Sequence, residues 1–263
     1  MEKLNFSRFG QWEQSYDPDL LLKLKVDSYN ASDGDLTGHD CKVCRNRGHI
    51  AFAAEDRVAF RDCSCMRIRR CVWEMEKSGL QNSIRELTFE AFQTTEPWQE
   101  TIKQGTMDYA QSMDGWLLLC GQSGSGKTHL CTAVCRLALL SGREVRYMPW
   151  REKVSQLKAW ALEAESRERM LNEYKKAEIL YIDDLYKGGE SPSAADVALS
   201  FELINYRYIN HLITLISTEK TPQELIAIDQ ATGSRMIEMA GDYVFDVSKD
   251  LRRNYRLRNI KSI

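Results

Sequence analysis

A glycine-rich string in the middle of the chain constrains the fold more than any other feature. Residues 121–128 read Gly-Gln-Ser-Gly-Ser-Gly-Lys-Thr, directly after the apolar run 116–120 and directly before a helical pattern. Strand, glycine loop and helix follow one another in the order of a phosphate-binding loop. Glycine allows backbone with positive φ and a close approach of peptide N–H groups to an anion. The string predicts an α/β P-loop fold that binds a nucleoside triphosphate, which we interpret as ATP.

The side chains of this loop have distinct expected roles. Lys127 brings a positive charge to the β- and γ-phosphates, and the hydroxyl of Thr128 is placed to bind Mg²⁺. The other candidates for nucleotide binding in this stretch are Gly121, Gln122, Ser123, Gly124, Ser125, Gly126 and His129. The alternative is a glycine-rich turn with a solvated lysine.

A pair of acids follows a second apolar run. Residues 177–182 are rich in β-forming side chains and too short for a helix, which indicates a buried parallel strand. The run ends in Asp183 and Asp184. We assign Asp183 to the Mg²⁺ ion and Asp184 to the attacking water, because carboxylates at the end of such a strand can serve both purposes. The alternative is an exposed acidic turn.

Four cysteines near the N-terminus form two close pairs on either side of residues 45–62. They are Cys41, Cys44, Cys63 and Cys65. Zn²⁺ takes four thiolates tetrahedrally and can replace the apolar core that so small a segment lacks. The second pair has only one residue between its sulfurs, so His39 or His49 could substitute as a ligand. We expect a structural zinc site here, with reduced free cysteines as the alternative. The residues between the two pairs alternate in polarity or run apolar around a turn, a pattern that indicates a β-hairpin.

The cysteine segment is locally basic. Its arginines are Arg45, Arg47, Arg57, Arg61, Arg67, Arg69 and Arg70. They could meet nucleic acid or an acidic partner, or pair with the acids nearby. The whole chain carries a net charge of −2, so any contact with DNA must come from a local patch.

Length and composition indicate an ordinary globular protein with a small appendage. The chain has 263 residues, of which 43% are hydrophobic and 28% charged. We found no signal sequence and no apolar run of membrane-spanning length, and therefore expect a cytoplasmic protein with thiols rather than disulfides. Strand patterns at 144–148, 213–217 and 243–247 alternate with helical ones, which predicts a mostly parallel sheet covered on both faces. We expect residues 1–80 to form a helical, zinc-binding module with a connector helix, and residues 81–263 to form the nucleotide-binding domain.

The whole set of motifs resembles the DnaC/DnaI family of AAA+ helicase loaders, especially those of phages and prophages. It comprises the cysteine module, the stretch 87–92 (LTFEAF), the string GQSGSGKTH, the stretch LYIDDL and the Asn-Tyr-Arg sequence at 254–256. The resemblance implies an ATPase that binds a hexameric replicative helicase and, in an ATP-dependent manner, delivers it to single-stranded DNA. It also implies that the zinc module contacts the helicase. IstB transposition ATPases share much of the set.

The resemblance also assigns residues. Lys127 and Thr128 match the Walker A positions, and Asp183 and Asp184 match Walker B. Many AAA+ proteins have Glu where this chain has Asp184; the shorter side chain stands farther from the water, so we expect slow hydrolysis.

Further assignments rest on single positions. Arg235 resembles an arginine finger for a neighbouring subunit, and Arg256 resembles a sensor that touches the nucleotide in cis; either could be a surface arginine. Thr218 occupies the sensor position after the 213–217 strand, but Glu219 beside it departs from the family pattern. We expect no C-terminal helical lid, so that activity depends on self-assembly or on docking to the helicase.

Contact with DNA is expected, by resemblance, after the second strand. Tyr147 and Trp150 could stack on bases beside Arg151 and Lys153, although Trp150 could equally be a core residue. Two other functions remain open: an IstB-like transposition ATPase, and a non-catalytic adaptor in which ATP only stabilises one conformation.

Overall fold

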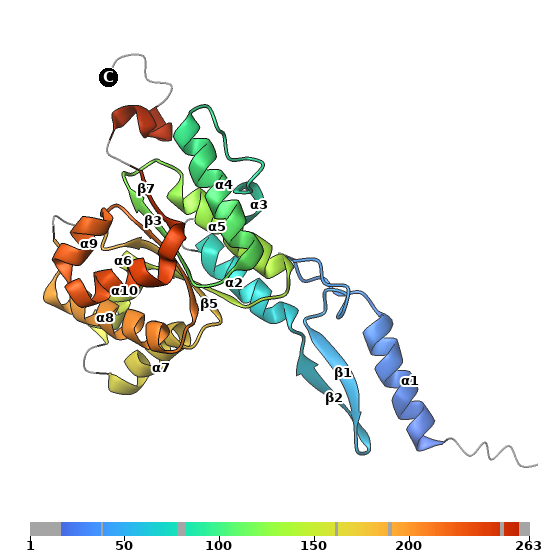
Figure 1. Ribbon diagram of the computed structural model, residues 1–263. Coiled ribbons are helices and arrows are strands. Elements are labelled where there is room, and N and C mark those ends of the chain that lie inside the picture. The colour runs from blue at the N-terminus through green and yellow to red at the C-terminus, as the bar shows by residue number, and fades with distance from the viewer. Residues whose placement is uncertain are drawn as a thin grey trace, which may run out of the picture. The chain divides into compact units, whose positions relative to one another are not determined.

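The computed structural model describes residues 17–37, 39–77, 83–160, 163–188, 191–247 and 250–257. The chain divides into two compact units, Met1–Met66 and Arg67–Ile263 (Figure 1). The sequence predicts a boundary at residue 80, whereas the chain divides into the two units after Met66. Helix α2 (Cys65–Lys77) therefore runs mostly in the second unit, because its Ile68 and Val72 are buried in that unit's core.

The first unit is a helix with a hairpin. Helix α1 (Pro18–Ala31) begins at the proline, with Asp17 as its cap. Strands β1 (His49–Ala54) and β2 (Arg57–Asp62) pair antiparallel, which confirms the predicted hairpin. The Asn30 side chain exchanges two hydrogen bonds with the Ala51 backbone, at 2.9 and 3.0 Å, and so fixes α1 against β1.

The second unit contains a five-stranded parallel sheet in the order β4-β5-β6-β3-β7. Its strands are β3 (Trp116–Gly121), β4 (Val145–Pro149), β5 (Ile179–Leu185), β6 (Ile213–Thr218) and β7 (Val244–Val247). Its helices after α2 are α3 (Ser83–Glu86), α4 (Pro97–Ser112), α5 (Lys127–Leu140), α6 (Trp150–Ala159), α7 (Ala164–Lys175), α8 (Ala194–Ile209), α9 (Pro222–Ile228) and α10 (Gln230–Ala240), with 3₁₀ turns η1 (Gly241–Tyr243), η2 (Leu251–Arg253) and η3 (Tyr255–Leu257).

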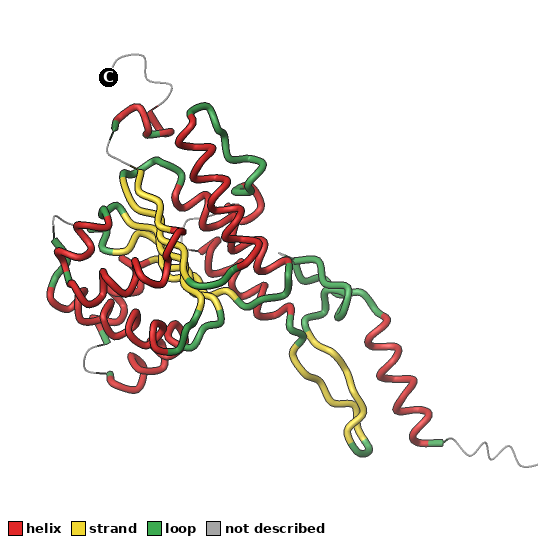
Figure 2. The backbone as a smooth tube through the Cα atoms, viewed as in Figure 1, coloured by secondary structure: helices red, strands yellow, loops and turns green. Residues whose placement is uncertain are grey.

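Helices cover both faces of this sheet, as the alternation of strands and helices predicts (Figure 2). Successive strand residues point to opposite faces. Leu117 and Leu119 therefore join a core with α4 and α5, whereas Trp116 and Leu118 join a second core with α6, α7, α8 and α10. The glycine loop and the acid pair both lie at the carboxyl ends of strands, so the fold brings them to one edge of the sheet.

Two short 3₁₀ turns follow β7, and no helical lid is present within residues 250–257. Within the described ranges, no helix combines the length and apolar character that a membrane crossing requires.

Candidate functional site

A pocket of about 410 Å³ lies over the glycine loop. Its floor is formed by residues 123–129, and α5 begins there at Lys127. Gly124 and Gly126 have φ of 77° and 92°, a backbone that side chains rarely adopt. A Cβ on Gly126 would collide with the Phe92 ring, so glycine lets the segment before α4 close over the loop. The loop has the shape of an anion cradle, with N–H groups of a helix N-terminus at its base.

Lys127 is buried at this helix start. Its Nζ donates to the carbonyl oxygens of Gly121 and Gln122, at 2.8 and 2.6 Å. Burial lowers the pKa of Lys127, since the charged form loses its hydration. Within the described ranges Lys127 makes no ion pair. A buried ammonium that lines the pocket beside the glycine loop suits a bound polyanion.

Asp183 lies beside Thr128, as the assignment of both to one metal site requires. The Thr128 hydroxyl donates to Asp183 Oδ1 over 3.1 Å. The carboxylate is 7% exposed and also accepts from the hydroxyls of Tyr147, Tyr181 and Ser217. Because the Thr128 hydroxyl donates its hydrogen bond to Asp183, the lone pairs of the Thr128 oxygen stay available for a cation.

Asp184 lines the pocket, whereas Asp183 is buried behind it. Asp184 has a φ of 57° and lies at a break in the β5–β6 register. Lys187 Nζ lies 2.7 Å from Asp184 Oδ2 and 3.4 Å from Glu219 Oε1. Burial and then the charge on Asp183 raise the pKa of the Asp184 carboxyl. The pocket thus offers two acids joined by Lys187, a residue that the sequence analysis did not single out.

The two candidates for the sensor position differ in location. Thr218 is buried, and its hydroxyl donates to the Leu185 carbonyl over 2.8 Å. It does not line the pocket, whereas Glu219 does. The strand residue that reaches the acids is Ser217, which accepts from the Asp184 N–H and donates to Asp183.

The segment 250–257 lies against the glycine loop. The Gln122 side chain donates to the Asp250 carbonyl and accepts from the Asp250 N–H, both over 2.6 Å. The Tyr255 N–H donates to the Gly124 carbonyl, and an Arg256 nitrogen lies 3.4 Å from Ser123 Oγ. Arg256 therefore lines the pocket, as its assignment to nucleotide requires, while the Gln122 side chain is used to hold this segment.

Arg235 lies on α10, outside the pocket of its own chain. Its guanidinium lies over the rings of Phe201 and Tyr208 and donates to the Ala231 carbonyl. It therefore does not reach the nucleotide position of this chain.

Aromatic stacking on DNA by the stretch after β4 does not fit the structure. Tyr147 is 2% exposed and Trp150 3%, and Trp150 packs edge-on against Tyr186 in the second core. Tyr147 lies in the first core and Trp150, the first residue of α6, lies in the second, so each ring is buried on its own face of the sheet although β4 is an edge strand. Of the four residues expected to meet DNA, Arg151 is exposed and Lys153 partly exposed.

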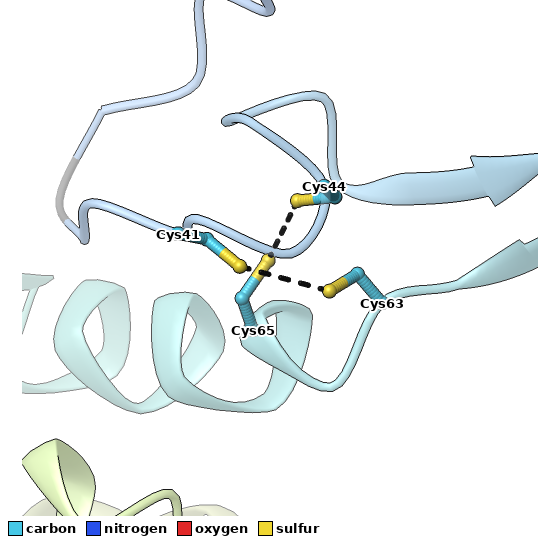
Figure 3. Close-up of side chains that lie close together, drawn as sticks. All are labelled: Cys41, Cys44, Cys63 and Cys65. Carbon is cyan, nitrogen blue, oxygen red and sulfur yellow. Dashed lines mark hydrogen bonds between the residues drawn. The ribbon is translucent and has the colours of Figure 1, made fainter. Parts of the chain in front are cut away.

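The four cysteines of the first unit converge, and their sulfur atoms all lie within 4.8 Å of one another (Figure 3). The Sγ atoms of Cys41 and Cys63 are 3.8 Å apart, and those of Cys44 and Cys65 are 3.4 Å apart. A tetrahedral Zn²⁺ with bonds of about 2.3 Å needs sulfurs about 3.8 Å apart. The geometry therefore fits zinc, although the second pair has only one residue between its cysteines.

The electrostatics of this cluster also suit a metal. Burial opposes ionisation, yet the Gly48 N–H and the neighbouring thiols lower the pKa of the Cys44 thiol to about 7. Burial raises the pKa of Cys63. The suggested histidine ligands do not join the group, and His49 instead lies 3.3 Å from Asp62.

Comparisons with known proteins agree with this geometry. Residues 56–231 match the family model of the IstB-like ATP binding protein. The chain is 33% identical over 245 residues to the phage-like element PBSX protein XkdC of Bacillus subtilis (strain 168), covering 88% of this chain and 91% of that protein. It is 24% identical over 209 residues to the replicative helicase loader DnaC of Escherichia coli (strain K12), covering 77% and 76%.

Solved structures show the same fold. The crystal structure of the DnaC helicase loader superposes with a TM-score of 0.55 at 19% identity, over 64% of this chain and 98% of that one. AMPPCP-bound DnaA from Aquifex aeolicus gives a TM-score of 0.52 at 19% identity, over 65% and 52%. The predicted AAA+ P-loop fold is confirmed.

Proposed function

The chain belongs to the IstB-like ATP binding protein family of AAA+ ATPases, and from this premise we propose that it is an ATP-dependent loader of a replicative helicase. It binds a hexameric helicase and delivers it to single-stranded DNA during replication. The observation that carries the proposal is its similarity to the DnaC loader of Escherichia coli over three quarters of both chains. Proteins of this family bind ATP, as the pocket of this chain would allow.

We assign the nucleotide and metal positions as follows. The N–H groups of the glycine loop and Lys127 would hold the phosphates, and Thr128 and Asp183 would hold Mg²⁺. Arg256 contacts the nucleotide from segment 250–257. Bound Mg²⁺ would supply charge neutralisation at the phosphates. Asp184 orients water, and its short side chain together with its pairing to Lys187 favours slow hydrolysis.

Assembly would complete this site. Arg235 lies outside its own pocket, which supports a role in the pocket of a neighbouring subunit. We therefore expect hydrolysis to rise when the chain self-assembles or docks on the helicase. The first unit, with Zn²⁺ held by its four cysteines, would contact the helicase.

Replacing Asp184 separates an ATPase from an adaptor. Asp184→Asn keeps the shape of the side chain but removes its charge, so nucleotide binding should persist while turnover falls by about 100-fold or more. ATP affinity and hydrolysis are measured with helicase and single-stranded DNA present. Asp114→Asn, at an exposed position, is the control. A wild-type chain without turnover under these conditions would favour the non-catalytic adaptor.

A transposition ATPase is the second candidate, because the family model is that of IstB and an IS21 ATP-binding protein of Pseudomonas aeruginosa is 24% identical over 183 residues. Co-purification separates the two. A loader should bind the host's replicative helicase in ATP and Mg²⁺, and should prefer single-stranded DNA. Preference for duplex DNA, with binding to a transposase and none to the helicase, would favour the second candidate.

A further inference from the structure

Two tyrosines converge on the buried acid of the site. The hydroxyl of Tyr181 donates to Asp183 Oδ1 over 2.6 Å, and that of Tyr147 donates to Oδ2 over 2.8 Å. Together with Thr128 and Ser217, four hydroxyl groups contact one carboxylate. In the part of the chain that the structure describes, Asp183 makes no ion pair, and these four hydroxyls are its side-chain hydrogen-bond donors.

The sheet explains how both phenols reach this carboxylate. Tyr181 lies two residues before Asp183 on β5, so both side chains point to the same face. Tyr147 is paired directly with Tyr181 in the parallel β4–β5 ladder. The two rings pack 5.3 Å apart within the first core, where they are 2% and 0% exposed. Rings held in a packed core have little freedom, so their hydroxyls are fixed donors.

The two phenols hold opposite ends of the carboxylate. Because one bonds Oδ1 and the other Oδ2, the group cannot rotate about its last bond without losing one of them. Oδ1 stays beside the Thr128 hydroxyl, 3.1 Å away. Partners that orient a metal-binding group in this way commonly set its affinity for the ion.

We propose that Tyr147 and Tyr181 are positioning residues, which hold Asp183 in the orientation that receives Mg²⁺ beside Thr128. This inference rests on the proposed binding of Mg-ATP. It gives Tyr147 a role inside the site, in place of the contact with DNA that its sequence position suggested.

The test separates the effect of Mg²⁺ on nucleotide binding from nucleotide binding itself. Tyr147→Phe and Tyr181→Phe are made singly in the full chain, and each keeps its ring and its packing. Binding of a fluorescent ATP analogue is titrated in EDTA and then over a range of Mg²⁺ concentrations. Tyr109→Phe is the matched control, because Tyr109 is equally buried but its hydroxyl donates to the Gly115 carbonyl.

Each variant should bind the analogue in EDTA as the wild type does, but should need about tenfold more Mg²⁺ to reach full affinity. The control should behave as the wild type throughout, and thermal unfolding should show all three variants folded. An unchanged Mg²⁺ requirement in both variants would overturn the inference. So would an equal loss of affinity with and without Mg²⁺, which a merely structural role produces. Failure of the wild type to bind the analogue at all would instead overturn the proposed function, and this inference with it.

Discussion

The ammonium of Lys127 lies in the interior with carbonyl oxygens as its partners, so the folded chain loses hydration energy at this position. The two hydrogen bonds to Gly121 and Gln122 offset part of that loss. A phosphate group would offset it further, because hydrogen bonds between charged groups are about twice as strong as neutral ones. The residue is therefore placed for its ligand rather than for stability.

Lys127→Met should separate these two contributions. Methionine has a similar length and no charge, so the melting temperature without nucleotide should stay the same or rise. ATP affinity should fall by about 10- to 100-fold, the value of one or two charged hydrogen bonds. Both are measured by thermal unfolding with and without ATP and Mg²⁺. Lys153→Met on α6 is the control for a general loss of charge, and an ATP-dependent shift that survives in Lys127→Met would contradict the assignment.

At the scale of elements, the motifs could be predicted because each is local. The glycine string specifies the phosphate-binding loop and the start of the helix after it, and the apolar run before Asp183 specifies a strand. The contacts between elements could not be predicted in the same way. Whether Ser217 or Thr218 faces the acids depends on the register of β5 and β6, which breaks between Ile182 and Leu185.

The phenols illustrate the same limit. Tyr181 could have been found from its two-residue spacing to Asp183, since side chains alternate along a strand. Tyr147 could not, because its position depends on which residue of β4 pairs with β5. The ion pair between Lys187 and Asp184 likewise depends on the left-handed backbone of Asp184. No local sequence pattern predicts that conformation for this aspartate.

Gln122 ties the segment 250–257 to the glycine loop. Gln122→Ala removes both hydrogen bonds to Asp250, so the backbone amides of this segment should exchange with solvent about tenfold faster. ATP affinity should also fall, because Arg256 belongs to the same segment. Hydrogen exchange and nucleotide titration measure the two effects. Gln111→Ala, at an exposed position of α4, should change neither, and unchanged exchange in Gln122→Ala would show that the segment is held by other contacts.

At the scale of the whole molecule, the two units are stabilised differently. The second has two large apolar cores, one on each face of its sheet. The first has a buried cluster of four cysteines with Ile50 against it, and α1 contributes no buried side chain. A small unit with so little apolar core usually needs a metal or disulfides. Its stability should therefore depend on Zn²⁺ in a way that the second unit's does not.

Removal of metal from the full chain tests this difference. Protein purified without chelators should carry about one Zn²⁺ per chain, because four thiolates fill a tetrahedral site. After chelation, hydrogen exchange should become fast across residues 39–66, since binding of the ion and folding of the site are coupled. Exchange in the sheet, and binding of ATP, should stay unchanged. Cys41→Ser should reproduce the effect of chelation without a chelator, whereas Cys120→Ser, at a buried thiol of β3, should retain the metal. Zinc content well below one equivalent would reject the site, and loss of ATP binding on chelation would show that the two units do not fold independently.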